Sequence, residues 1–332
     1  MTMKSAPSLL AAIIVLSAIA PLTTGFTPGR SSTPTSPLAS YLDSLSGQQQ
    51  PNGIATSYSP APFRPSPPAP VINVATTATP PVFHHASPEY FSLNNLNSKG
   101  LRSSYDWGRP QDWSRTLADV SDEFSAGTWY CTEGGWQSSN AKAVTEVFYV
   151  IEGHGMLGDA DGARHYFGPG DLVIIPKGHT GRWDVNTPIH KLWAVNDHAY
   201  IEESGPIIRV QVIHYRDFFA PHSLVETAML GNDPLYGRLP GPVISSSASN
   251  ILYDVGSTQV GVWTCNPGSF EVVPLAGKGM WFHVLEGLMF ITNDSDGTTK
   301  RCVAGDTVLL PPGWSGLIDV LEPVKKLFTV AR

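Results

Sequence analysis

The sequence predicts an all-β protein in which two tandem barrels follow a disordered N-terminal segment. Charged residues make up 15% of the 332 residues, against about 25% in typical soluble domains. Short segments rich in Val, Ile, Leu and aromatic residues alternate with turns, in a chain that holds 31 Gly and 29 Pro. No long stretch keeps a 3.6-residue apolar period, and a set of landmarks occurs twice in the same order.

The first 25 residues are typical of a secretory signal peptide. Lys4 precedes an apolar run over residues 9–20, and Thr23 and Gly25 provide small residues before a cleavage site at Phe26. At about 1.5 Å per residue this run is too short to cross a ~30 Å hydrocarbon core. A buried core helix is the alternative interpretation.

Residues 26–88 are rich in Ser, Thr and Pro and contain a single acidic residue, Asp43. Such a composition predicts disorder, because too little apolar surface is available to offset the chain entropy. Phe26 at the predicted mature terminus, with Pro28 two residues later, resembles the bipartite presequence of algae with secondary red plastids. The resemblance implies location in the chloroplast stroma, and secretion with a mucin-like stalk is the alternative.

Charge and cysteine content exclude several other classes. The net charge is −7, and no cluster of Lys and Arg is present, which argues against a nucleic-acid partner. Cys131, Cys265 and Cys302 are too few and too widely spaced for a disulfide or zinc framework. We expect no membrane association of the mature form, and we expect a homo-oligomer.

The internal repeat defines two domains. Residues 127–135 recur at 261–269, and residues 170–178 recur at 305–313, with a drift of one residue between the two offsets. Lys191 likewise matches Lys326. We therefore predict a first domain with an N-terminal arm over residues 89–200, and a second domain with a linker arm over residues 201–332.

The repeated motifs resemble the cupin superfamily, whose domains are jelly-roll β-barrels. The first copy reads Glu-x-x-Tyr-Val-x-x-Gly from Glu146 to Gly153, and then Gly170, five residues, and Pro-x-Gly at residues 176–178. It is most similar to the branch named for (S)-ureidoglycine aminohydrolase, which includes ethanolamine-utilisation cupins. This resemblance implies hydrolase or lyase chemistry on a small polar metabolite.

The conventional cupin metal ligands, however, are missing. The family pattern implies two His and one Glu from the first motif and one His from the second. The His positions here hold Ser139, Ala141 and Gly181, and a shift of one residue in the first motif gives Asn140 and Lys142 instead. Because Glu146 alone remains, we expect no metal and no other cofactor.

Strand parity places the candidate site of the first copy. Residues two apart share a strand face, so Glu146 and Phe148 should face the barrel interior together with Trp183. Glu146 is the candidate acid–base residue, with a pKa raised by desolvation unless a donor pairs it. Tyr149, Phe148, Trp183 and His179 are the candidate ligand-binding residues. A structural role for Glu146, bonded to backbone N–H groups, is the alternative.

The second copy predicts an apolar interior, because Met280 stands in place of Glu146 and Ile318 in place of Trp183. We interpret it as a structural barrel. Two functional hypotheses remain open for the whole chain: a small-molecule-binding or hydrolytic protein that uses the first copy, and a non-catalytic protein in which both barrels serve assembly. An unconventional metal site that joins Glu146 to His154, His165 and His179 is a weaker alternative.

Overall fold

The computed structural model describes residues 81–121, 124–197, 208–221, 223–226, 232–233, 237–238, 246–273 and 279–332. All of them belong to one compact unit, Pro37–Arg332. The predicted signal peptide, most of the predicted transit segment and the predicted domain boundary at residue 200 lie outside the described residues. In the described part, no helix has the length and apolarity needed to cross a membrane.

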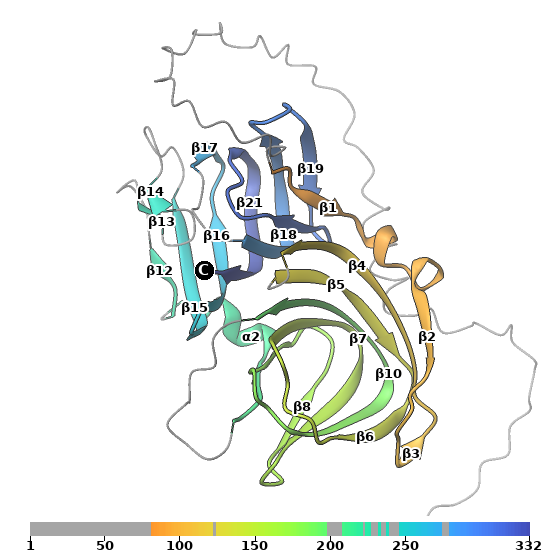
Figure 1. Cartoon of the computed structure of the whole chain (residues 1–332). Coiled ribbons are helices and arrows are strands. Elements are labelled where there is room, and N and C mark those ends of the chain that lie inside the picture. The colour runs from red at the N-terminus through yellow and green to blue at the C-terminus, as the bar shows by residue number, and fades with distance from the viewer. Residues whose placement is uncertain are drawn as a thin grey trace, which may run out of the picture. The chain divides into compact units, whose positions relative to one another are not determined.

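The first repeat copy folds into a ten-stranded antiparallel sheet (Figure 1). Its order is β11-β9-β7-β10-β5-β4-β2. In addition, β6 pairs with β10 and with β3, and β8 pairs with β7. The bounds are β2 Asn97–Leu101, β3 Trp107–Gly108, β4 Gln111–Ser121, β5 Phe124–Cys131, β6 Gly134–Ser138, β7 Thr145–Asp159, β8 Arg164–Phe167, β9 Leu172–Ile175, β10 Gly181–Asn196 and β11 Gln211–Ile213.

The second copy repeats this arrangement in a nine-stranded sheet of order β1-β20-β18-β21-β16-β15-β12, in which β17 pairs with β21 and β19 with β18. Its bounds are β1 His84–Ala86, β12 Val225–Glu226, β15 Ser247–Val255, β16 Thr258–Cys265, β17 Gly268–Val272, β18 Gly279–Asn293, β19 Thr299–Val303, β20 Thr307–Leu310 and β21 Gly316–Ala331. The remaining elements are a small hairpin and three single turns of helix: β13 Asn232–Asp233, β14 Gly237–Arg238, η1 Pro88–Phe91, η2 Leu93–Asn95 and α2 Tyr215–Phe218. The all-β prediction is confirmed.

Strand registers show how closely the two copies correspond. In the first, Lys191 of β10 lies opposite Val150 of β7, and in the second, Lys326 of β21 lies opposite Val284 of β18. Each of these long strand pairs contains register shifts at its centre. The duplication inferred from the sequence therefore extends to individual residue pairs.

Each barrel receives a strand from the segment that precedes the other barrel. Strand β1, the first described strand of the chain, pairs with β20 of the second barrel, where Figure 1 shows it among the blue strands. Strand β11, which precedes the second barrel, pairs with β9 of the first. The prediction of disorder over residues 26–88 is wrong for the end of that range, because residues 84–86 form β1.

Three apolar clusters form the core. One fills the first barrel and includes Phe148 and Trp183, and one fills the second barrel and includes Met280 and Ile318. The third contains buried residues of both copies, such as Val147 and Trp281. Alternation along the first halves of β7 and β18 produces this division, since Phe148 and Met280 face the barrel interiors whereas Val147 and Trp281 face the shared core.

Two equivalent glycines mark the centres of the long strands. Gly153 has φ +84° and Gly287 has φ +92°, a region that L side chains rarely adopt. A Cβ atom at Gly153 would lie 1.9 Å from the carbonyl oxygen of Pro188, and one at Gly287 would lie 2.2 Å from that of Pro323. The glycines thus allow two long strands to pass at close range.

We expect Gly287→Ala to destabilise the protein by more than about 2 kcal/mol, because backbone strain and a backbone clash add together. Gly297→Ala is the matched control, since its φ is +69° but no atom lies within 4 Å of the added Cβ. It should cost only the left-handed penalty of about 1–2 kcal/mol. Denaturant unfolding measures both variants, and equal losses would contradict the close-approach argument.

Candidate functional site

Glu146 lies at the start of β7 and forms ion pairs with two lysines. The Nζ atom of Lys191, from the adjacent strand β10, donates to Glu146 Oε1 at 2.6 Å. The Nζ atom of Lys142 donates to the other carboxylate oxygen. Glu146 and Lys191 are both buried, whereas the Lys142 side chain is 30% exposed. One carboxylate therefore holds two ammonium groups at the barrel interior.

Aromatic rings surround the ammonium group of Lys191. Its Nζ lies 4.0 Å from the ring centroid of Phe148, 4.6 Å from that of Trp183 and 4.8 Å from that of Trp129. The negative face of an aromatic ring attracts a cation at such distances, most strongly where water is excluded. The rings thus stabilise the buried charge together with Glu146.

Trp183 is the centre of this aromatic cluster. Its ring stacks on Trp136, with centroids 5.9 Å apart, and on Phe148, with centroids 5.7 Å apart. The guanidinium carbon of Arg102 lies 4.0 Å from the Trp136 centroid, and Arg102 also pairs with the buried carboxylate of Asp112. Trp183 fills the interior of the barrel, as strand parity predicted.

A cavity of about 300 Å³ opens beside these groups. Four of its lining side chains are cationic and one is anionic, so the lining carries an excess of positive charge. The lining residues are Lys99, Arg102, Ser114, Trp129, Trp136, Lys142, Glu146, Trp183, Lys191, Trp193 and Val195.

The ionisation of Glu146 follows from its partners. Burial by itself would raise the pKa of Glu146, but the charges of Lys142 and Lys191 hold that pKa well below its usual range. Desolvation lowers the pKa of Lys191, and Glu146 opposes this effect. The raised pKa predicted for an unpaired carboxylate does not occur, because the donors that would prevent it are present.

The conventional cupin metal does not fit this site. Glu146, the one ligand of the family pattern that is present, pairs with the ammonium groups of Lys142 and Lys191. These positive charges would repel a divalent cation at the same carboxylate. Lys142, the residue in the shifted motif-one position, is itself one of these cations. We therefore derive no chemistry through a metal at Glu146.

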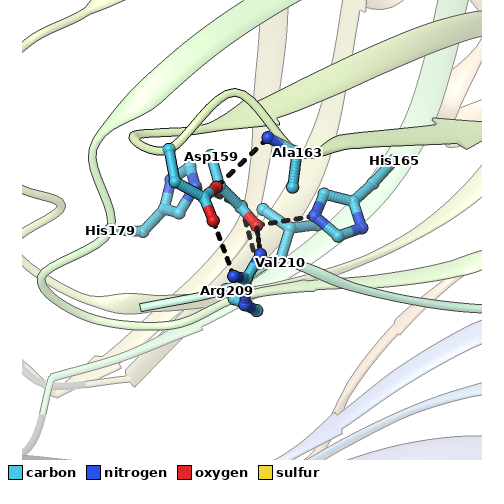
Figure 2. Close-up of polar contacts among 7 residues, drawn as sticks. Asp159, Ala163, His165, His179, Arg209 and Val210 are labelled. Carbon is cyan, nitrogen blue, oxygen red and sulfur yellow. Dashed lines mark hydrogen bonds and ion pairs between the residues drawn. The ribbon is translucent and has the colours of Figure 1, made fainter. Parts of the chain in front are cut away.

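His179 participates in a separate cluster around Asp159, at the end of β7 (Figure 2). The Nε2 atom of His165 lies 2.7 Å, and that of His179 3.1 Å, from different oxygens of the fully buried Asp159 carboxylate. The backbone N–H of Val210 and the guanidinium group of Arg209 also donate to it. Burial alone would raise the pKa of Asp159, yet these donors hold it below its usual value.

This cluster fastens the segment before β11 to the first barrel, since Arg209 and Val210 belong to that segment. The predicted ligand-binding residue His179 thus contacts Asp159 and does not line the cavity around Glu146. The alternative of a metal site that joins Glu146 to His154, His165 and His179 has no support in these contacts, and the His154 ring lies beside the hydroxyl of Thr187.

Tyr149 likewise lies apart from Glu146, on the opposite face of β7. Its ring centroid is 5.2 Å from that of His283 in the second barrel, and both residues line a second pocket of about 390 Å³. His190 also lines this pocket. Burial lowers the pKa of His190 to about 4 and that of His283 to about 3, so both imidazoles are neutral at pH 7.

The interior of the second barrel is less uniform than the sequence indicated. Met280, Phe282 and Ile318 are buried in an apolar cluster, in agreement with the prediction. The prediction of an entirely apolar interior is wrong, because the side chain of Lys326 is completely buried there. Its Nζ lies 4.1 Å from the Phe282 centroid and 4.5 Å from that of Trp263, which compensates for part of the desolvation.

Comparison with known proteins agrees with this geometry. The family model of the EutQ-like cupin domain matches twice, over residues 119–193 and 254–328. The chain carries two EutQ-like cupin domains. The resemblance to cupins, the tandem organisation and the barrel fold predicted from the sequence are thereby confirmed.

Solved bacterial structures share the fold of the tandem cupin. One is a protein of unknown function from Pseudomonas syringae pv. tomato, with a TM-score of 0.55 and 20% identity over 76% of this chain and 100% of that chain. Another, from Pseudomonas aeruginosa and provisionally described as glyoxylate-induced, has a TM-score of 0.51 and 14% identity over 82% of this chain and 94% of that chain. No curated protein matches significantly.

The second cupin domain contains a group of possible metal ligands that sequence analysis did not find. The group consists of His85, Cys302 and Asp306, whose ligand atoms lie within 4.8 Å of one another. His85 and Asp306 are 221 residues apart in the chain. The expectation that the protein holds no metal is therefore not established.

Sequence analysis also missed the cations of the first cupin domain. Lys191 was a repeat landmark and shares strand parity with Trp193 and Val195, which line the same cavity, so parity could have identified it. Lys142 was noted only as a residue that cannot replace a His ligand. Arg102 follows β2, and no spacing indicated that this part of the arm would reach the barrel.

We expect Glu146→Gln to destabilise the protein at pH 7 by about 3 kcal/mol, because it leaves the buried ammonium of Lys191 without its counter-charge. The pKa of Glu146 is lower in the folded state than its unfolded value of 4.5. Its charge therefore stabilises the folded protein fully above pH 4.5, and this contribution is lost as the pH falls toward the folded-state pKa. The difference in the free energy of unfolding between parent and variant should therefore be constant from pH 7 to about 5 and decrease below pH 4.5.

Denaturant unfolding across this pH range measures this difference. The double variant Glu146→Gln/Lys191→Met is the control and should recover stability, because it also removes the buried charge. A Glu146→Gln protein as stable as the parent at pH 7 would show that these ion pairs do not hold the barrel.

Proposed function

We propose that the first cupin domain binds a small organic anion in the cavity beside Glu146. The observation that supports this is the charge of the lining, in which the cations Lys99, Arg102, Lys142 and Lys191 outnumber the one lining carboxylate, Glu146. Asp112, which does not line the cavity, pairs with Arg102. Glu146 and Asp112 together neutralise about two of these four charges, so a net attraction for an anion remains. Lys99 is exposed and the Lys142 and Arg102 side chains are each 30% exposed, so a ligand can reach these three cations from solvent.

The size and walls of the cavity restrict the ligand further. A volume of about 300 Å³ lies at the lower end of the range for small-molecule sites. Trp129, Trp136, Trp183 and Trp193 supply flat apolar surfaces beside the cations. This combination favours a carboxylate with a small planar or apolar body over inorganic phosphate.

The ionisation of Glu146 favours binding over proton transfer by this residue. A carboxyl group with a pKa well below its usual range is not a proton donor at neutral pH and is a weak base. Metal-independent hydrolase or lyase activity would therefore need another group. The rival function, a non-catalytic assembly protein, is favoured by the mutual neutralisation of Glu146 and Lys191 inside the barrel.

Titration calorimetry with two- to six-carbon mono- and dicarboxylates, glyoxylate included, tests the proposal. At least one of them should bind with one site per chain. Lys142→Met should weaken that binding by about 10- to 100-fold, the usual effect of one charge-assisted hydrogen bond. Lys177→Met is the matched control, because Lys177 pairs with Asp197 outside the cavity, and its affinity should equal that of the parent.

If no carboxylate binds, or if Lys142→Met binds as tightly as the parent, the anion-binding function is excluded and the assembly function is favoured. Inorganic phosphate bound with equal affinity would mean that the tryptophans do not contribute to selection.

We further propose that the protein acts in the plastid. The support is the sequence of residues 1–25, which is typical of a signal peptide and is followed by Phe26 and an acid-poor segment. A fluorescent protein fused behind residues 1–88 should accumulate in the chloroplast stroma of a host with secondary red plastids, and Phe26→Ala should retain it in an earlier compartment. Secretion of the unmodified fusion would instead support the extracellular alternative.

A further inference from the structure

Three potential metal ligands meet where β1 joins the second cupin domain. His85 belongs to β1, Cys302 to β19, and Asp306 to the turn between β19 and β20. The Nε2 atom of His85 lies 3.1 Å from Asp306 Oδ2, and the sulfur of Cys302 lies within 4.8 Å of both ligand atoms. This group is separate from the cavity beside Glu146, which the other domain contains.

The spacing of the three atoms suits a single tetrahedral ion. Zinc binds nitrogen and oxygen at about 2.0–2.2 Å and sulfur at about 2.3 Å, so the ligand atoms around it lie roughly 3–4 Å apart. Separations of up to 4.8 Å require only small side-chain rotations to reach these values. Three protein ligands would leave a fourth position for water.

The chemistry of the group favours zinc over harder cations. A thiolate, an imidazole and a carboxylate form a mixed sulfur, nitrogen and oxygen set, whereas Mg²⁺ and Ca²⁺ select oxygen ligands. Cys302 and Asp306 are buried, and the His85 side chain is 18% exposed, so the group reaches the surface at His85. Within the described residues, no other cluster of this kind is present.

The first domain shows which members of the group the fold itself requires. Its Asp171 accepts a hydrogen bond from the backbone N–H of Gly168, as Asp306 does from Val303, and thereby holds the same turn. Asp171 also bonds a histidine of the crossing segment, His214, at 2.8 Å.

The position of Cys302 is occupied in the first domain by Phe167, since the two residues have equivalent partners in the strand register. The turn and its histidine therefore form without a thiol. Both Cys302 and Phe167 are buried in the apolar core of their barrel, and a thiol beside the Asp–His pair occurs in the second domain, not in the first.

We propose that His85, Cys302 and Asp306 bind one zinc ion, which fastens β1 to the second cupin domain. Strand β1 contributes only three residue pairs to β20, and a shared ion adds a strong link between His85 and the barrel. The attachment of β1, which precedes the first domain in the chain, would then depend on a metal ion bound by the second domain.

The test uses the full chain, stripped of metal with a chelator and titrated with Zn²⁺ by calorimetry. One equivalent should bind, and Zn²⁺ should raise the melting temperature because it binds only the folded state. Co²⁺ should substitute for zinc and show the near-ultraviolet absorption of a thiolate–cobalt bond. His85→Ala and Cys302→Ser should each lose at least tenfold in Zn²⁺ affinity, since even residues that merely support a ligand cost about 10- to 100-fold.

His84→Ala and Cys265→Ser are the matched controls. His84 is the neighbour of His85 in β1, and Cys265 is a buried cysteine of the same barrel outside the ligand group. Both should bind Zn²⁺ like the parent. Melting of the metal-free variants verifies that each is folded, and Cys302→Ala replaces Cys302→Ser if the hydroxyl prevents folding.

Absence of Zn²⁺ binding, retained affinity in folded His85→Ala and Cys302→Ser, or equal loss in the controls would overturn the proposal. A cobalt spectrum without the thiolate band would also overturn it, because the sulfur would then not be a ligand.

Discussion

The first cupin domain depends on the burial of one positive charge, the ammonium group of Lys191, inside an aromatic barrel. An unpaired charge in an apolar interior costs far more free energy than a domain has to spare. Glu146 supplies the counter-charge, and the ring faces of Phe148 and Trp183 supply further attraction. Because Glu146 and Lys191 lie on neighbouring strands, the register of β7 and β10 must hold for the pair to form.

The second domain contains part of this arrangement, and the comparison shows which features both barrels share and which occur beside Glu146. Lys326 lies against Phe282 and Trp263 at the position of Lys191, but Met280 replaces Glu146. The lysine over aromatic rings is therefore common to both copies. Among the residues that the structure describes, the carboxylate paired with two ammonium groups and the cationic cavity occur in the first copy.

Two segments cross between the domains, and each adds a strand to the sheet of the domain that it reaches. Strand β11 is held on the first barrel by backbone pairing, and the residues before it bond the buried carboxylate of Asp159. Strand β1 is held on the second barrel in the same way, with His85 bonded to Asp306. Each sheet thus includes a strand from the segment that precedes the other domain, and residues of both copies share an apolar core.

The sequence by itself determined the duplication, the barrels, and the inward position of Trp183 and Glu146, because strand parity and turn residues act locally. It could not show that Tyr149 faces the other domain, that His179 bonds Asp159, or that His85 meets Cys302. These contacts join residues of different elements, and their distances follow from how the sheets close and pack. The tertiary structure also decided the charge of the site: local pattern identified Glu146, but only packing brought Lys142, Lys191 and Arg102 to one cavity and so set its ionisation.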